Sequence, residues 1–417
     1  MRKICQKSVT WVVLVTVILE VVILAIRDAE SWVGIWPRMA VICQIPLVYI
    51  GPIWAVFAAF YAVRTQENSF FAVSAALRPW RIHIVRIVRC FCYSVVPYLV
   101  GWMYILAVSW NRFGTGGIWW SYVLLALLEL LGSVTIGYGC GIWIGGWFAQ
   151  AIAFFLSYLW LTVSWDFSGA IVNQTYGYPD TDVNRYKIAA LALFVAVVLL
   201  SACLTAYVKV LVACRWKSFS LLVVSASGCV LAIIAATFGV WLPGDYLTLR
   251  TDPQAMQCSH THPQICVWQE NSQKMPELLS YSAQLATLKQ EFGFAIPDVI
   301  SEQGLPTATG EALIFSIRGG TMWFTTHEWA FGIVDASFTN RCPASSEQAF
   351  AEQTQAYHEL VSWMDFRMHG GQPSPVHGGH PDVDPQAMRR MSLAPLTEQH
   401  QWVSQHLAKL GDANGCQ

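Results

Sequence analysis

The chain has 417 residues, of which 55% are hydrophobic and 12% are charged, and its formal net charge is −1. Residues 1–242 carry 16 basic and 8 acidic side chains, whereas residues 243–417 carry 9 and 18. Long uncharged stretches exclude a soluble protein for the first part. The acidity of the second part argues against binding to nucleic acid or to an anionic lipid surface.

Seven apolar segments fill most of the first part. Segments 39–63, 90–111 and 218–244 contain no Asp, Glu, Lys or Arg, and each exceeds the roughly 20 residues that a helix needs to cross a bilayer. The sequence therefore predicts an α-helical polytopic membrane protein with about seven transmembrane helices in a membrane domain over residues 1–242. The predicted spans lie near residues 8–26, 39–63, 90–111, 119–136, 147–165, 188–208 and 218–242.

The first span is interpreted as a retained helix and not as a cleaved signal peptide. Its apolar run is longer than a signal core, and the sequence from Arg27 is a poor cleavage site. The uncharged stretch 137–146 fits either a tight turn or a broken helix. Within it, Gly137, Gly141 and Gly145 recur at a spacing that aligns small residues for close helix packing, within one chain or between subunits.

Orientation follows from the loops, because Lys and Arg near span ends are retained in the cytoplasm. With the N-terminus inside, the cytoplasmic segments hold eleven basic residues and the exterior loops hold five. We expect a multi-pass protein of the plasma membrane, in contact with its lipid, with a cytoplasmic N-terminus. Seven spans then make residues 243–417 an extracytoplasmic domain.

The longest cytoplasmic segment, 64–89, reads as a basic and partly amphipathic interfacial helix interrupted by Pro79. It is either a loop anchored by its arginines or a docking surface for a cytosolic partner. The arginines that would serve docking are Arg64, Arg78, Arg81, Arg86 and Arg89.

This topology resembles that of permease subunits of ABC-type exporters of the ABC-2 class. The resemblance covers residues 1 to about 215 and rests on six spans, a cytoplasmic helix after the second span and a longer exterior segment before the sixth. It implies that 64–89 docks on a separate cytosolic ATPase and that two permease chains, identical or different, dimerise. The seventh span and the exterior domain depart from the six-span pattern and look like an accessory module, as found on some actinobacterial membrane proteins.

Two acidic residues lie within the predicted spans, Glu20 nearer an outer end and Glu129 near a centre. An ionisable group inside a membrane is costly and is a functional candidate. Glu129 is expected either to make a hydrogen-bonded packing contact or to take part in proton coupling, which would make the protein an ion-coupled carrier.

The exterior domain is long enough for one core and has a mixed α/β or mainly α pattern. Residues 370–385, rich in Gly, Pro and His, are interpreted as a flexible linker and not as a cation chelator. Helices are predicted at 274–292, 328–339, 346–368 and 397–410, and strands at 311–318 and 321–326.

Four cysteines in the exterior domain permit two disulfides, and Cys258 with Cys266 closes the shortest loop. The alternative is a metal site in which His260 and His262 join these two thiols. Disulfide formation is favoured, because thiols outside the cell oxidise, so no metal is expected. The disulfide candidates are Cys258, Cys266, Cys342 and Cys416.

No motif for catalysis is complete. His327 and Glu328 begin like a zinc-protease helix, but Phe331 occupies the position of the second histidine ligand. Neither a phosphate-binding loop nor a serine-nucleophile elbow occurs. We therefore expect no enzymatic activity and no cofactor, and ATP hydrolysis would belong to a partner.

Two functions remain open at this point. The first is a permease-like subunit of an ATP-driven exporter with an exterior accessory domain. The alternative is a membrane anchor that presents an extracytoplasmic sensor or binding module and transports nothing.

Overall fold

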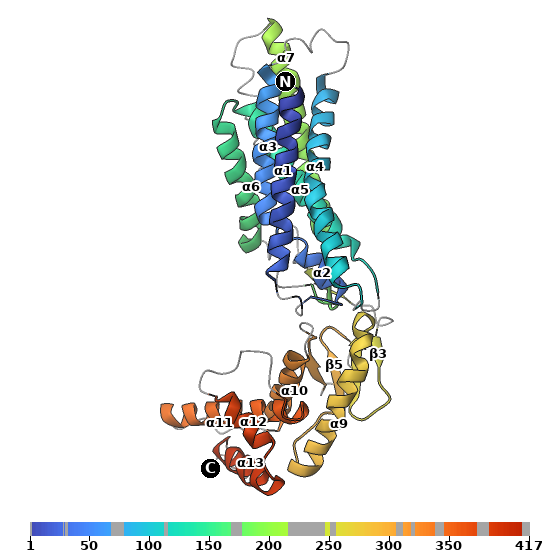
Figure 1. Cartoon of the computed structure of the whole chain (residues 1–417), viewed down its shortest axis with the longest axis vertical. Helices are drawn as coiled ribbons and strands as arrows, with labels where there is room; N and C mark the ends of the chain where they lie inside the picture. Colours follow the sequence, from blue (N-terminus) through green and yellow to red (C-terminus); the bar gives the residue numbers. More distant parts are fainter. Residues whose placement is uncertain are drawn as a thin grey trace. The chain divides into compact units, whose positions relative to one another are not determined.

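A computed structural model describes residues 2–27, 29, 32–67, 79–111, 116–167, 177–215, 247–250, 256–305, 312–317, 322–337, 346–372 and 383–410. The chain divides into two compact units (Figure 1). The first, here called the membrane unit, comprises Met1–Phe113 and Gly117–Leu249; the second, the tail unit, comprises Gly114–Gly116 and Arg250–Gln417.

The membrane unit is built from long apolar helices (Figure 1). Five are long and apolar enough to cross a membrane, over Ser8–Ala25, Leu47–Arg64, Arg81–Val108, Trp120–Trp143 and Arg185–Leu204, and Phe148–Thr162 is a shorter apolar helix. The expected span at 218–242 lies outside the described residues, so the count of seven stays a prediction. The helices are α1 (Arg2–Ala25), α2 (Trp36–Ile42), α3 (Leu47–Glu67), α4 (Pro79–Val108), α5 (Trp120–Trp143), α6 (Phe148–Phe167) and α7 (Arg185–Arg215).

The second predicted span is not one helix over 39–63. The chain turns after Ile42, which ends α2, and α3 begins at Leu47. Pro46 explains the break, because proline has no N–H to donate and disfavours helical backbone in the residue before it. The Gln44 side chain fixes the turn on α5 by donating a hydrogen bond of 2.7 Å to the carbonyl of Tyr122.

Residues 137–146 divide between a helix and a turn. Helix α5 continues to Trp143, and Gly145 and Gly146 then adopt φ angles of 69° and 64° before α6 begins. Gly145 therefore lies beyond the helix, and the expected row of three helical glycines contains two. A Cβ atom at Gly137 or Gly141 would run into the backbone of α3, at Ala55 and Ala59.

The tail unit contains a four-stranded sheet in the order β3-β4-β5-β6; Figure 1 labels two of its strands, β3 and β5. The first pair is antiparallel and the next two pairs are parallel. Helix α9 connects the parallel strands β4 and β5, so the unit contains a β-α-β crossover. The strands are β3 (Met256–Cys258), β4 (Gln264–Trp268), β5 (Val299–Glu302) and β6 (Leu313–Phe315), and a short ribbon in the membrane unit pairs β1 (Thr181–Val183) with β2 (Leu247–Leu249).

Helices supply most of the tail core. Trp329 and Trp363, both fully buried, pack with the aliphatic faces of the helices and with β4 and β5. The strand expected at 321–326 is wrong, because α10 already begins at Trp323. The helical spacing of Trp329, Ala330, Ile333 and Val334 buries one face and overrides the β-branched threonines. The helices are α9 (Met275–Phe292), α10 (Trp323–Ala336), α11 (Glu347–Met368), α12 (Pro385–Ser392) and α13 (Leu396–Leu410), with a 3₁₀ turn, η4, at Gln269–Lys274.

Candidate functional site

The arginines expected to dock a partner lie at the adjoining ends of α3 and α4. Arg64 is near the end of α3, and its guanidinium lies 5.4 Å from the centre of the Phe60 ring. Arg81 and Arg89 are exposed in the first turns of α4, and Arg86 between them is half-buried. Arg78 lies outside the described residues.

Helix α4 is longer than a bilayer requires. Its 30 residues rise about 45 Å, against a hydrocarbon core of about 30 Å, so its basic first turns extend beyond an apolar span. His83, in these turns, is joined to α5 by a contact of 2.8 Å between its Nδ1 and the Tyr138 hydroxyl. The basic end of α4 is thus tied directly to the neighbouring helix.

Both acidic residues of the predicted spans are fully buried in the membrane unit. Among the described residues, neither Glu20 nor Glu129 has a hydrogen-bond partner for either carboxyl oxygen. Glu20 packs against Gly101 of α4, where a Cβ atom would collide with its carboxyl group. A hydrogen-bonded packing contact, one of the two roles expected for Glu129, is not found among these residues.

The disulfide between Cys258 and Cys266 is present. The two residues lie directly opposite each other on β3 and β4, so neither thiol is free to bind a metal. His260 and His262 are exposed in the loop between the strands, and the described residues contain no group of three or more His, Cys, Asp or Glu that could hold a metal ion. Cys342 and Cys416 lie outside the described part of the chain.

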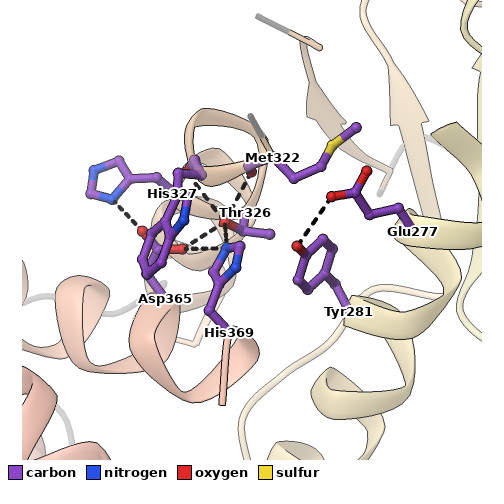
Figure 2. A network of polar contacts seen from close by, with 8 residues as sticks. Glu277, Tyr281, Met322, Thr326, His327, Asp365 and His369 are labelled. Carbon is purple, nitrogen blue, oxygen red and sulfur yellow. Dashed lines mark hydrogen bonds and ion pairs between the residues drawn. The ribbon is translucent and has the colours of Figure 1, made fainter. Parts of the chain in front are cut away.

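One network of polar side chains in the tail unit, here called the Asp365 cluster, consists of Thr326, His327, Asp365 and His369 (Figure 2). The Thr326 hydroxyl lies 2.6 Å from Oδ1 of Asp365 and 2.8 Å from Nε2 of His369. His327 approaches the other carboxylate oxygen, with its Nδ1 3.5 Å from Oδ2. Helix α10 supplies the first two residues, α11 supplies Asp365, and His369 caps the end of α11.

The hydrogen bonds determine the roles of these groups. An ionised Asp365 can only accept, so the Thr326 hydroxyl donates to it and accepts from Nε2–H of His369. Burial lowers the pKa of His369, and the negative charge of Asp365 opposes that shift. The neutral ring with its proton on Nε2 satisfies both contacts.

Aromatic rings enclose His369. Trp323 is stacked on the imidazole, with ring centroids 3.8 Å apart and an interplanar angle of 8°, and Tyr281 of α9 lies 4.6 Å away on centroids. Burial, with the nearby charge of Glu277, raises the pKa of Tyr281 to about 12, so its phenol is neutral at physiological pH. The ring of His369 is therefore an internal group that joins α9, α10 and α11.

The geometry of the cluster does not assemble a nucleophile. The Thr326 side chain is fully buried, so its hydroxyl is closed to a substrate. The ring of His327, by contrast, is 45% exposed. Glu328 accepts a 2.6 Å hydrogen bond from the backbone N–H of Ser316, which gives its carboxylate a structural partner, and Phe331 contacts Tyr357 edge to face.

By sequence, His327 was considered only in an incomplete zinc-protease motif, and the structure brings it together with His369 at Asp365. His369 belongs to the helix end and not to the linker, because Gly370 and Gly371 close α11 with φ angles of 61° and 73°. Part of the expected linker, residues 373–382, lies outside the described residues. No motif indicates Thr326, Asp365, Trp323 or Tyr281. The i, i+4 spacing of Asp365 and His369, which spans the end of the predicted helix 346–368, is a signal that could have indicated this pair.

Acidification is expected to destabilise the tail unit through His369. The folded state lowers the pKa of this ring, so below about pH 6.5 the unfolded chain binds a proton that the folded unit binds less readily. The free energy of unfolding of the tail unit then decreases as pH falls from 6.5, by at most about 1.4 kcal/mol per pH unit. At higher pH the ring is neutral in both states, so His369 adds no pH dependence.

Urea unfolding of residues 250–417 at several pH values between about 5.5 and 7.5 measures this dependence. His369→Gln removes the titrating ring and should flatten the profile, whereas His260→Gln, at an exposed loop position, is the control and should leave it unchanged. Equal slopes for the wild type and His369→Gln would refute the assignment.

The comparisons with known proteins concern the tail unit. Residues 265–413 match a family described as Domain of unknown function (DUF7224). The match begins in β4 and extends just beyond α13, and it includes all four residues of the Asp365 cluster. No curated protein and no solved structure matches the chain.

Proposed function

We propose that the chain is a permease-like subunit of an ATP-driven exporter and that the tail unit is its extracytoplasmic binding domain. The observation that carries this proposal is the basic beginning of α4. Arg81, Arg86 and Arg89 stand on a helix that is longer than a bilayer span, close in sequence to the loop that would face the cytosol. Such a rigid, positively charged end suits an acidic surface on a cytosolic protein.

Contacts inside the membrane unit would couple the basic end of α4 to the neighbouring helices. A displacement at the arginines would move α4 as a continuous helix, and the contact between His83 and Tyr138 would transmit it to α5. Helix α5 in turn packs closely against α3 at Gly137 and Gly141, where an added Cβ atom would meet the backbone of Ala55 and Ala59. Docking of an ATPase could therefore shift three helices together.

Location of the tail unit outside the cytoplasm is part of the same proposal. The apolar helices support membrane association, and the Cys258–Cys266 disulfide is compatible with an oxidising compartment. The excess of Lys and Arg in the loops assigned to the cytoplasm supports a cytoplasmic N-terminus. Two such permease chains would form the transport path, as the ABC-2 resemblance implies.

Charge reversal tests the docking surface. In Arg81→Glu/Arg86→Glu/Arg89→Glu, we expect a co-purifying ATPase to be lost, because attraction at the contact becomes repulsion. The measurement is purification from the native membrane in mild detergent, with mass spectrometry of the proteins that co-elute.

The matched control replaces the same three arginines by lysine, which keeps the charge and should keep most of the binding. Accessibility of tags at both termini checks that reversal has not altered the orientation of the spans. An ATPase retained at wild-type stoichiometry by the glutamate variant would exclude this contact.

A second function is favoured by the independence of the tail unit. This unit has its own hydrophobic core and its own disulfide, as a sensor or binding module held at the membrane would require. Recovery of the full chain without any ATPase, together with ligand binding by the tail unit, would select this alternative.

A further inference from the structure

We propose that His406 forms a proton-dependent clamp, which holds the last helix of the tail unit, α13, on α11 while its ring is protonated and releases it at alkaline pH. The clamp is a property of the fold and does not depend on an ATPase partner. Only its exposure to the pH outside the cell rests on the proposed extracytoplasmic location of the tail unit.

Both nitrogens of the His406 ring face acceptors. Nδ1 lies 2.8 Å from the backbone carbonyl oxygen of Trp402, one turn earlier in α13, and Nε2 lies 2.6 Å from Oε2 of Glu359 in α11. A carbonyl oxygen can only accept a hydrogen bond, so Nδ1 carries a proton. A neutral imidazole has one N–H, and it therefore has no second proton for the contact at Nε2.

The second proton is shared between Nε2 and Glu359. The other carboxylate oxygen, Oε1, accepts a hydrogen bond of 3.0 Å from the side-chain amide of Gln355, one turn earlier in α11. An ionised carboxylate satisfies both contacts as an acceptor, and the His406 ring then donates from both nitrogens. The pair is thus an imidazolium and a carboxylate joined by a charge-assisted hydrogen bond.

The surroundings of the ring favour its positive charge. His406 is 5% exposed, and the ring of Trp402 lies over it with the two centroids 3.8 Å apart, which is close enough for a cation–π attraction. A buried cation needs a partner of opposite charge, and Glu359 supplies it.

The other charged groups near this interface are occupied elsewhere. Helix α13 packs against α11 and α12, and on α12 Arg389 donates to a backbone carbonyl while Arg390 pairs with Asp384. The second histidine of α13, His400, lies against an aromatic ring of α9. Among the described residues, the proton of the clamp is therefore the one positive charge that meets Glu359.

Loss of this proton makes one of the two contacts unfavourable. A neutral ring keeps one N–H, so its other nitrogen presents a lone pair to an oxygen that also only accepts. Folding thus retains a proton that an unfolded histidine gives up above about pH 6.5. The clamp stabilises the tail unit below that pH, and its contribution is lost as pH rises.

His406 and His369 act in opposite directions. Burial lowers the pKa of His369, so that ring weakens the unit below about pH 6.5, whereas His406 weakens it above that pH. The tail unit should therefore be most stable near pH 6.5, and α13 should loosen first on the alkaline side. His369→Gln should remove the acid loss and retain the alkaline one.

The test is hydrogen exchange with mass spectrometry on the purified full chain in detergent, at about pH 6.5 and about pH 8.5. Rates in α13 are corrected for the intrinsic effect of pH and compared with those in α10 as an internal reference. We expect the protection of α13 to fall by about tenfold or more, since one proton permits at most about tenfold per pH unit. The protection of α10 should change much less.

Two variants isolate the clamp. His406→Gln removes the titrating ring, so we expect weak protection of α13 that no longer differs between the two pH values. His400→Gln, at an exposed position of the same helix, is the matched control and should reproduce the loss seen in the wild type. Equal protection of α13 at both pH values in the wild type, or a loss that persists in His406→Gln, would overturn the proposal.

Ring ¹⁵N NMR of the wild type, with labelled histidine, decides the question if His406→Gln fails to fold. A ring protonated on both nitrogens at about pH 7.5, where free imidazoles are mostly neutral, supports the clamp, and the absence of any such ring refutes it. Neither result bears on the docking of an ATPase, because that proposal is tested by co-purification.

Discussion

Replacement of Gly137 by alanine is expected to disrupt the membrane unit, although alanine is the better helix former. A Cβ atom at this position would lie 2.5 Å from Cα and 2.6 Å from the carbonyl carbon of Ala55 on α3. Backbone atoms cannot rotate away as a side chain can, so α3 and α5 must separate. The gain in helix propensity is about 1 kcal/mol, and we expect overpacking to outweigh it by about 3 kcal/mol or more.

The measurement is the melting temperature and the elution profile of the full chain in detergent. Gly139→Ala, in the same helix, meets the ring of Trp143 at 3.2 Å, which can shift, so a much smaller effect is expected. Gly117→Ala meets nothing within 4 Å and should be neutral. If Gly137→Ala matched these two controls in stability, the close approach of α3 and α5 would be wrong.

The second large effect is expected at Glu302, in the sheet of the tail unit. Its side chain is almost fully buried and accepts hydrogen bonds from the backbone N–H of Trp268, at 2.9 Å, and from the Asn271 side chain, at 2.6 Å. It therefore connects β5 to the end of β4 and to η4. Glu302→Ala leaves both donors buried without an acceptor, which should cost about 2–5 kcal/mol.

Urea unfolding of residues 250–417 measures the loss. Glu302→Gln keeps one acceptor oxygen and should recover part of the stability. Glu291→Ala removes the partly exposed ion pair with Arg367, at 2.8 Å, and should cost less than about 1 kcal/mol. A loss at Glu302 no larger than that at Glu291 would contradict the structural role of the buried carboxylate.

Local sequence patterns predicted the helices that bury one apolar face and expose the other. Helices α9, α11 and α13 occur within one residue of the expected ranges 274–292, 346–368 and 397–410, because each has an apolar stripe and recognisable ends. The strand expected at 321–326 was wrong, because Thr326 lies in α10, within hydrogen-bond distance of the Met322 carbonyl at the start of that helix and of Asp365 in α11. Tertiary contacts overrode the local preference there.

Candidate site residues were predicted only where the residue type or its spacing is unusual for its segment of the sequence. Glu20 and Glu129 are rare charges in apolar segments, and the Cys258–Cys266 pair is a short cysteine spacing. The contact between Thr326 and Asp365 joins residues 39 positions apart, and no periodicity indicates such a pair.

The Cys258–Cys266 bridge has a consequence for biosynthesis. A disulfide is completed only after its thiols reach an oxidising compartment. If the tail unit is extracytoplasmic as proposed, a newly made chain and a mature one differ by two thiol hydrogens. The fraction of oxidised chains in a cell would then report the fraction of copies whose tail has completed translocation.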